Sequence, residues 1–469
     1  MKKSIINNIC RAVFSNVFAS LSSVLGVVLF PKVLSSETYG YWQLFLFYLS
    51  FVGFLHFGWE DGIYLRYAGI CMEKIDKKVL SGQLIMLFIV QCLFGGVIVY
   101  VAIQYFYDKE LIYILLMIGV LVPIVNLNNM FNFLFQITNM IEKYSNRLIL
   151  EKIFFLLSVL ICYYFEPLEH HALIQSQALA LLFVFLLGMK FYSNILIFDL
   201  PSINDVVKET KNNIKIGINL MLANISNILM LGIVRWGISE CWSIEVFGKI
   251  SLSLSIANFF MVAINAVGIA LFPIFKKMRQ QELKSFYIKV RNTLMPVCFF
   301  LMLIYYPASG FVLYWLPNYK EIIEWMIYIF PVGIFECRVI LLTNTYLKSL
   351  RKEKVMLLIN GVSTMISCGV TLLGCLFFHD LTFMMIGIVF IFAFRCILME
   401  IYLWRVLELN FYMQLLMELI MVISFIILNI KFSGIYGGIL YSLVLGMYLY
   451  FQRNMIRKHC DWQNDLFDL

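Results

Sequence analysis

Residues 80–106 read LSGQLIMLFIVQCLFGGVIVYVAIQYF, a run without a single charged side chain. A helix of about 20 apolar residues is long enough to cross a hydrocarbon core of ~30 Å. Because the run is continuous and does not alternate, it predicts a transmembrane helix and not a barrel strand. Similar segments occupy most of the chain, at 12–33, 41–65, 111–139, 149–165, 172–196, 214–235, 249–273, 293–315, 325–346, 355–378, 382–404, 412–430 and 434–452. The sequence therefore predicts an all-α polytopic membrane protein with about 14 transmembrane helices.

Positive charge is distributed unevenly between the connections of these segments. If the N-terminus is cytoplasmic, 28 of the 36 Lys and Arg residues fall in cytoplasmic connections and 6 in outer ones. The remaining two, Arg338 and Arg395, lie inside apolar segments. The positive-inside rule then predicts that both termini are cytoplasmic. Basic residues at a lipid surface also account for the net charge of +8, so no nucleic-acid partner is expected.

Composition separates this chain from soluble proteins and offers no catalytic site. Hydrophobic residues make up 62% and charged residues 14%, against about 25% charged in soluble domains. The 11 cysteines form no CxxC motif and no group with zinc-binding spacing, so they are interpreted as packing residues. No GxxxxGK[ST] motif or catalytic constellation is present in the sequence. We therefore expect no enzyme activity, no cofactor and no metal.

A short internal repeat divides the chain into halves. Glu37-Thr-Tyr-Gly40 and Glu245-Val-Phe-Gly248 share the pattern Glu-x-aromatic-Gly at an offset of 208 residues, and coincidence is the alternative explanation. Six crossings separate the two copies, so the halves have the same orientation, as in parallel repeats. This predicts two pseudo-symmetric six-helix lobes around a central cavity, followed by a helix pair. The expected domains are 1–200, 201–406 and 407–469.

Several motifs resemble the polysaccharide repeat-unit (Wzx-type) flippases of the multidrug/oligosaccharidyl-lipid/polysaccharide (MOP) exporter superfamily. The resemblance depends on the order of short motifs along nearly the whole chain: Pro31, 37–40, Gly58-Trp-Glu-Asp-Gly-Ile-Tyr-Leu-Arg66, 215–224, Val234-Arg235, Phe247-Gly248 and Leu271-Phe-Pro273. The family often carries an acidic residue where this chain has Val234. An ion pair assumed there does not transfer to this sequence.

The resemblance implies transfer of an undecaprenyl-pyrophosphate-linked oligosaccharide from the inner to the outer leaflet of the bacterial cytoplasmic membrane. It implies alternating access between two lobes, for O-antigen, capsule or exopolysaccharide synthesis. Membrane lipids, a polysaccharide polymerase and a chain-length regulator are the implied partners. Three alternatives stay open: a multidrug or cation antiporter of the same superfamily, a membrane-embedded polymerase or glycosyltransferase, and a structural scaffold. Mainly basic deep charges argue against the antiporter, and short outer loops argue against the enzyme.

Two arginines are the first candidates for substrate contact. Arg338 and Arg395 each lie thirteen residues into their predicted segments, where an unpaired charge costs several kcal/mol. They are predicted to line the cavity and bind pyrophosphate, for which the guanidinium group is suited. The alternative is a structural ion pair. Glu336 is two positions from Arg338 and does not share its helix face, so partners would come from other helices. Glu336 is itself a candidate for gating or ion coupling.

Other candidates lie near helix ends and on polar stripes. Glu60, Asp61 and Arg66 end the second predicted helix on the cytoplasmic side, and Glu60 and Asp61 lie in a predicted turn from Gly58 to Gly62. We interpret these three residues, with Arg235, as gate or ion-coupling candidates. The alternative for these residues is a solvated or lipid-facing helix end. Amides at one helix face, Asn126, Asn129, Asn132 and Gln136, together with Asn224, are predicted to contact sugars in a wet cavity. Helix–helix hydrogen bonding is the alternative for these amides.

Overall fold

The computed structural model describes all residues except 1, 68–74, 166, 194–201, 258–279, 351, 433 and 468–469. Side chains are also left undescribed at 2–10, 12, 13, 17, 280–282, 348, 349, 353 and 454–467. Every regular element within the described residues is helical, which confirms the predicted all-α class. Twelve of the described helical segments are long and apolar enough to cross a membrane. The chain is therefore a multi-pass membrane protein.

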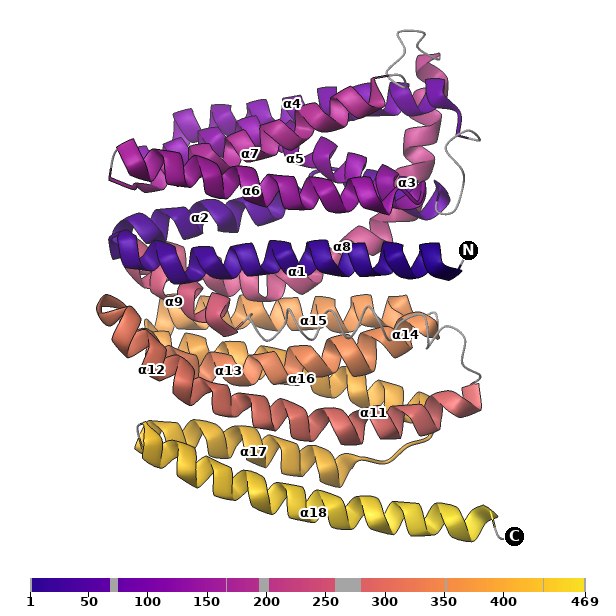
Figure 1. The fold of residues 1–469 in the computed structure, drawn as a ribbon, viewed down its shortest axis with the longest axis vertical. Coiled ribbons are helices and arrows are strands. Elements are labelled where there is room, and N and C mark those ends of the chain that lie inside the picture. Colours follow the sequence, from indigo (N-terminus) through magenta and orange to yellow (C-terminus); the bar gives the residue numbers. More distant parts are fainter. Residues whose placement is uncertain are drawn as a thin grey trace. The chain divides into compact units, whose positions relative to one another are not determined.

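Contacts divide the chain into two compact units, which we describe separately (Figure 1). Unit 1 comprises residues 1–232 and 242–248, and unit 2 comprises 233–241 and 249–469. The expected boundary at residue 200 was drawn from the repeat and stays a prediction. Helix α8 begins after that boundary, and its residues up to Gly232 pack within unit 1.

Unit 1 is a bundle in which α4 packs on α5, α1 on α6, and α5 and α6 on α7. Its helices are α1 (Lys2–Val33), α2 (Ser36–Val52), α3 (Trp59–Tyr67), α4 (Lys77–Tyr105), α5 (Lys109–Ile137), α6 (Ile141–Phe165), α7 (His170–Tyr192), most of α8 (Ile203–Cys241) and the start of α9 (Ile244–Ala257). Asp76 and Asp108 cap α4 and α5 by accepting from backbone N–H groups.

Unit 2 contains the remaining helices, and several of its spans change helix type along their length. Its elements are α11 (Gln280–Leu301), η2 (Met302–Ile304), α12 (Tyr305–Trp315), η3 (Pro317–Tyr319), α13 (Ile322–Arg338), η4 (Val339–Asn344), α14 (Thr345–Ser349), α15 (Glu353–Leu372), η5 (Leu373–Phe378), α16 (Leu381–Leu407), α17 (Tyr412–Lys431) and α18 (Ile435–Phe467). Elements η4 and η5 are π-helical. Helix α13 packs on α16 and α17, and α17 on α18.

Twelve predicted segments correspond to the twelve candidate spans, and the other two do not. The predicted segment 249–273 is described only as far as Ala257. The predicted segment 41–65 is not a single helix, because the chain turns between Gly53 and Gly58. Phe57 and Gly58 have φ values of 51° and 81°, outside the helical region. Gly62 was predicted to close this turn and lies instead inside α3.

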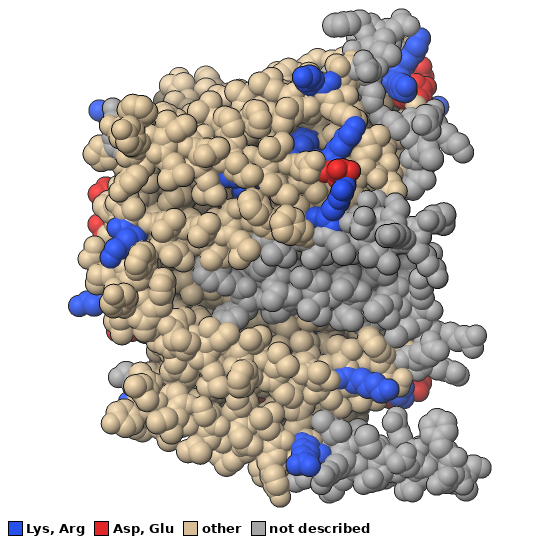
Figure 2. Space-filling model, viewed as in Figure 1, with Lys and Arg blue, Asp and Glu red and all other residues tan. Residues whose placement is uncertain are grey.

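Apolar side chains cover the outside of both units, as expected for surfaces in contact with lipid. Leu93, Leu160 and Leu443 are each more than 60% exposed. Figure 2 shows that much of the described surface on the face in view carries no charged side chain. Lipid would cover this apolar surface, so its exposure does not indicate a missing protein partner.

Candidate functional site

Helix α3 lies directly against α8, and three glycines make this approach possible. A Cβ atom on Gly62 would lie 1.9 Å from the carbonyl oxygen of Asn213, and one on Gly217 would lie 2.0 Å from that of Gly58. Gly58 also has the positive φ that starts α3. The spacing Gly58-x-x-x-Gly62 is the small-residue pattern that permits close helix packing in membranes. That spacing could have predicted the contact, although not the partner helix.

Hydrogen bonds between side chains reinforce the same contact. Gln83 Oε1 on α4 accepts from Trp59 Nε1 at 3.1 Å and from Asn213 Nδ2 at 2.6 Å. Arg66 donates to Asn213 Oδ1 at 2.5 Å and forms an ion pair with Glu209 at 2.7 Å. Three helices therefore converge on one polar group. We call Arg66, Glu209, Asn213 and Gln83, together with the neighbouring His56, Glu60 and Asp61, the α3–α8 polar centre. Glu60, Asp61 and Arg66 were predicted from the sequence, and the other members were not.

Glu60 is the unusual member of the α3–α8 polar centre. Its side chain is fully buried, and within the described part of the chain neither carboxylate oxygen has a hydrogen-bond partner. Asp61 is also buried, and its Oδ2 lies 3.8 Å from Nε2 of His56. His56 Nδ1 accepts from the backbone N–H of Gly58 at 3.0 Å. A buried carboxylate without a donor is unfavourable, so this group is suited to bind a proton or a cation.

The amide stripe on α5 has two kinds of environment. Asn126 is fully buried and donates to Val52 O at 3.2 Å and to Gln91 Oε1 at 2.7 Å. Gln91 in turn donates to Leu55 O at 3.0 Å, so these two amides bind backbone carbonyl groups at the break after α2. The other predicted stripe members are partly buried: Asn129, Asn132 and Gln136. Asn224 on α8 is exposed.

A buried arginine that sequence analysis did not select lies beside this stripe. Arg147 on α6 donates to Asn128 Oδ1 at 2.6 Å and to Val184 O at 3.1 Å. Asn128 donates to Leu181 O at 2.9 Å. The positive-inside count had placed Arg147 in a connection, so its burial could not be predicted. Its guanidinium group ties α6 to α5 and α7.

Arg338 lies in a balanced ion network within unit 2. Its Nε donates to Glu400 Oε1 at 2.9 Å, its Nη2 also contacts Glu400, and Nη2 lies 3.1 Å from Glu418 Oε2. Arg291 donates to the same Glu418 oxygen at 2.9 Å and to Gln414 at 2.7 Å. All four charged side chains are at most 2% exposed. These contacts favour the structural alternative for Arg338, and its predicted role in substrate binding stays a prediction.

The remaining charged candidates of unit 2 also have partners on other elements. Arg395 on α16 forms an ion pair with Glu336 on α13 at 2.9 Å. Arg235 on α8 donates to Ser251 Oγ on α9 at 2.9 Å. Glu336 therefore pairs with Arg395 and does not pair with its sequence neighbour Arg338. The predicted roles of these residues in binding or gating stay predictions.

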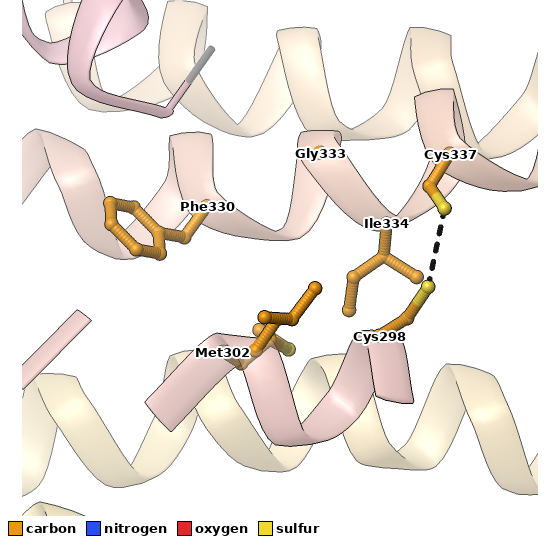
Figure 3. A pocket seen from close by; sticks show the side chains of 7 residues that line it. Cys298, Met302, Phe330, Gly333, Ile334 and Cys337 are labelled. Carbon is orange, nitrogen blue, oxygen red and sulfur yellow. Dashed lines mark hydrogen bonds between the residues drawn. The ribbon is translucent and has the colours of Figure 1, made fainter. Parts of the chain in front are cut away.

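Figure 3 shows a pocket within unit 2 between α11, η2 and α13. It is lined by apolar and sulfur-containing side chains, with Cys298 and Cys337 joined by a hydrogen bond of 3.3 Å between their sulfur atoms. Its volume of about 20 Å³ is close to the space that one water molecule needs. The pocket is therefore too small for an oligosaccharide or a lipid headgroup.

Solved structures with the same fold come from transporters and a flippase. The chain is similar to the lipid II flippase MurJ in an inward closed conformation, with a TM-score of 0.61 and 12% identity over 97% of this chain and 99% of that chain. It is similar to an inward-facing multidrug resistance MATE family transporter of the MOP superfamily, with a TM-score of 0.61 and 12% identity. The alignment covers 84% of this chain and 94% of that transporter. A MOP superfamily transporter from Pyrococcus furiosus aligns with a TM-score of 0.53 and 11% identity, over 86% of this chain and 95% of that one.

The sequence itself matches no protein-family model and no curated protein. At 11–12% identity, the likeness to solved structures shows the fold and leaves the substrate open. The all-helical architecture, the apolar surface and these neighbours agree with one another. The protein is a multi-pass membrane protein with the fold shared by MATE transporters and the MurJ flippase.

Proposed function

We propose that this protein is a flippase for undecaprenyl-pyrophosphate-linked oligosaccharide repeat units in a bacterial cytoplasmic membrane. The observation that carries the proposal is the extent of the likeness to the lipid II flippase MurJ, which spans 97% of the chain. The aligned part of the MATE transporter is smaller, at 84% of the chain. A lipid-linked saccharide combines an apolar tail with a polar headgroup, so a protein embedded in the bilayer with polar groups inside it suits this substrate.

The α3–α8 polar centre supplies an element that can couple transport to an ion. Glu60 and Asp61 lie in the first turn of α3, where the helix end favours negative charge. A proton or cation bound at Glu60 would remove the cost of the unpaired buried carboxylate. Glu60 lies on the short helix α3, which the glycine contacts hold against α8, so a proton or cation bound at Glu60 would change the packing around α3. We propose that this change biases alternating access between two states.

The experiment is to locate lipid-linked repeat units by leaflet in cells that lack this gene and retain the downstream polymerase. Repeat units accumulating on the cytoplasmic leaflet, and restored to the outer leaflet by the wild-type gene, would support the flippase. Complementation with Glu60→Gln tests the coupling element, with Glu321→Gln as a control whose carboxylate is exposed. Normal outward-facing repeat units that fail to polymerise would instead place the protein with the enzymes.

A multidrug or cation antiporter is the second candidate, and one observation favours it. Glu60 is a buried carboxylate without a partner among the described residues, which is a site for an exchanged cation. The sequence argument against an antiporter, that deep charges are mainly basic, does not hold. Arg338 and Arg395 each pair with buried or partly buried glutamates. Drug efflux from vesicles containing the purified protein would separate the two functions.

A further inference from the structure

A cluster of two histidines and one glutamate lies at the N-terminal ends of α5 and α7 and shares no residue with the α3–α8 polar centre. His170 and His171 begin α7, and Glu110 lies in the first turn of α5. Glu110 Oε2 is 2.7 Å from Nε2 of His170 and 3.2 Å from Nε2 of His171. One donor atom from each residue lies within 4.8 Å of the others. The three donors therefore surround one point.

The surrounding structure fixes the positions of these three side chains. Asp108 caps α5 by accepting from the backbone N–H of Glu110 at 2.9 Å, which sets the start of that helix. The ring centroids of Tyr41 and His170 are 5.1 Å apart, and those of Tyr113 and His171 are 4.5 Å apart. Helices α5 and α7 also pack on each other. The donors are thus held by rigid elements and not by a loop.

Both a protected and an accessible side are present at the cluster. The His170 side chain is 8% exposed, whereas those of His171 and Glu110 are 36% and 34% exposed. An ion could therefore enter from one side and be shielded on the other. His171 also has Glu169 Oε2 at 3.8 Å from its Nδ1, the ring nitrogen that does not face Glu110. Carboxylates at that position orient metal-bound histidines and raise their basicity.

We propose that Glu110, His170 and His171 form a binding site for a divalent transition-metal ion of the Zn²⁺ type. Two imidazole nitrogens and one carboxylate oxygen are a donor set that suits Zn²⁺, and three protein ligands leave a fourth position for water. Hard cations such as Mg²⁺ prefer oxygen ligands and octahedral geometry. The bound ion would join the first turns of α5 and α7, which are 60 residues apart in sequence. This site is independent of the proposed transport function.

The test measures metal binding to the purified full-length protein in detergent after treatment with a chelator. We expect Zn²⁺ to bind with one-site stoichiometry in calorimetry and to raise the thermal midpoint, while Mg²⁺ does neither. His170→Gln and Glu110→Gln should abolish this binding, and Glu169→Gln should weaken it about tenfold. His379→Asn is the matched control, because it removes a histidine that lies near a helix end and outside the cluster. Asn is chosen because the backbone of His379 has a φ of 46°, a conformation that Asn tolerates.

X-ray absorption by the Zn²⁺ complex separates this site from the cysteines. The proposal expects only nitrogen and oxygen ligands, at about 2.0–2.2 Å. Sulfur ligands at about 2.3 Å would overturn it, because the ion would then bind cysteine. Zn²⁺ affinity that is unchanged in both His170→Gln and Glu110→Gln, or the absence of binding to the wild type, would also overturn it. In that case the three residues form only a hydrogen-bonded contact between α5 and α7.

Discussion

The two units solve the problem of buried charge in different ways. In unit 2, Arg291 and Arg338 share the carboxylates of Glu400 and Glu418, so two positive charges meet two negative ones. In unit 1, Glu60 is equally buried and has no hydrogen-bond partner among the described residues. A charge-balanced network holds helices together, whereas a buried carboxylate without a positive partner leaves capacity for a ligand. The incomplete site is therefore the better candidate for function.

The largest expected effect comes from breaking the unit 2 network. Glu418→Ala removes the carboxylate that contacts both Arg291 and Arg338 and leaves buried positive charge uncompensated. Loss of one member of a buried pair costs about 3–5 kcal/mol. We expect a large drop in the thermal midpoint of the purified protein in detergent. A midpoint equal to that of the wild type would show that the network does not stabilise unit 2.

Replacing a whole pair sharpens the same comparison. Arg338→Met alone leaves the buried Glu400 carboxylate without its ion-pair partner. The double variant Arg338→Met with Glu400→Met leaves Arg291 and Glu418 as a balanced pair. Contacting residues show interaction energies of about 0.5–3 kcal/mol, so the double variant should be more stable than the sum of the single ones. Each variant is measured by thermal unfolding and by complementation. A stable double variant that has lost transport would favour substrate contact by Arg338.

The glycine contact in unit 1 is expected to have a smaller effect on stability. Gly62→Ala places a methyl group against the backbone of Asn213, and overpacking of this kind costs about 1–3 kcal/mol. The thermal midpoint and the complementation of a deletion strain are measured together. Gly361→Ala is the control, because a Cβ atom there meets nothing within 4 Å. Equal midpoints for the two variants would contradict the close packing of α3 on α8.

Glu60 should affect transport far more than stability. Glu60→Gln keeps the shape of the side chain and removes its ability to ionise. No hydrogen bond of the described structure is lost, and the neutral amide removes the cost of an unpaired buried carboxylate, so the variant should be no less stable than the wild type. Leaflet assays should nevertheless show loss of transport. Wild-type transport by this variant would remove Glu60 as the coupling residue.

The smallest effect is expected at an exposed ion pair. Arg11 and Glu142 approach to 2.5 Å, and their side chains are 49% and 60% exposed. Surface pairs contribute about 0.2–1 kcal/mol, so Glu142→Gln should shift the thermal midpoint only slightly. High salt should reduce the difference further, because it screens exposed charges. A shift as large as that of Glu418→Ala would mean that exposure does not separate these two pairs.

Some of the candidate site could be predicted, because chemistry local to one helix is visible in sequence. The small-residue spacing at Gly58 and Gly62 and the acidic pair between them point to α3. The hydrogen-bond partners of Trp59 on α4 and of Arg66 on α8 are 24 and 147 residues away, and no spacing rule relates them. The same limit applies to the proposed metal site. Glu110 lies 60 residues from His170, so the cluster has no motif.

The sequence by itself determined the class of this protein. Apolar runs of membrane-spanning length permit only helices, because no other open structure satisfies backbone hydrogen bonds in lipid. The tertiary structure alone decided which deep charges are neutralised. Arg338 and Arg395 were conspicuous in sequence, yet their partners come from other helices, and helix pairing is set by packing. Whether a buried charge is available to a ligand depends on those contacts.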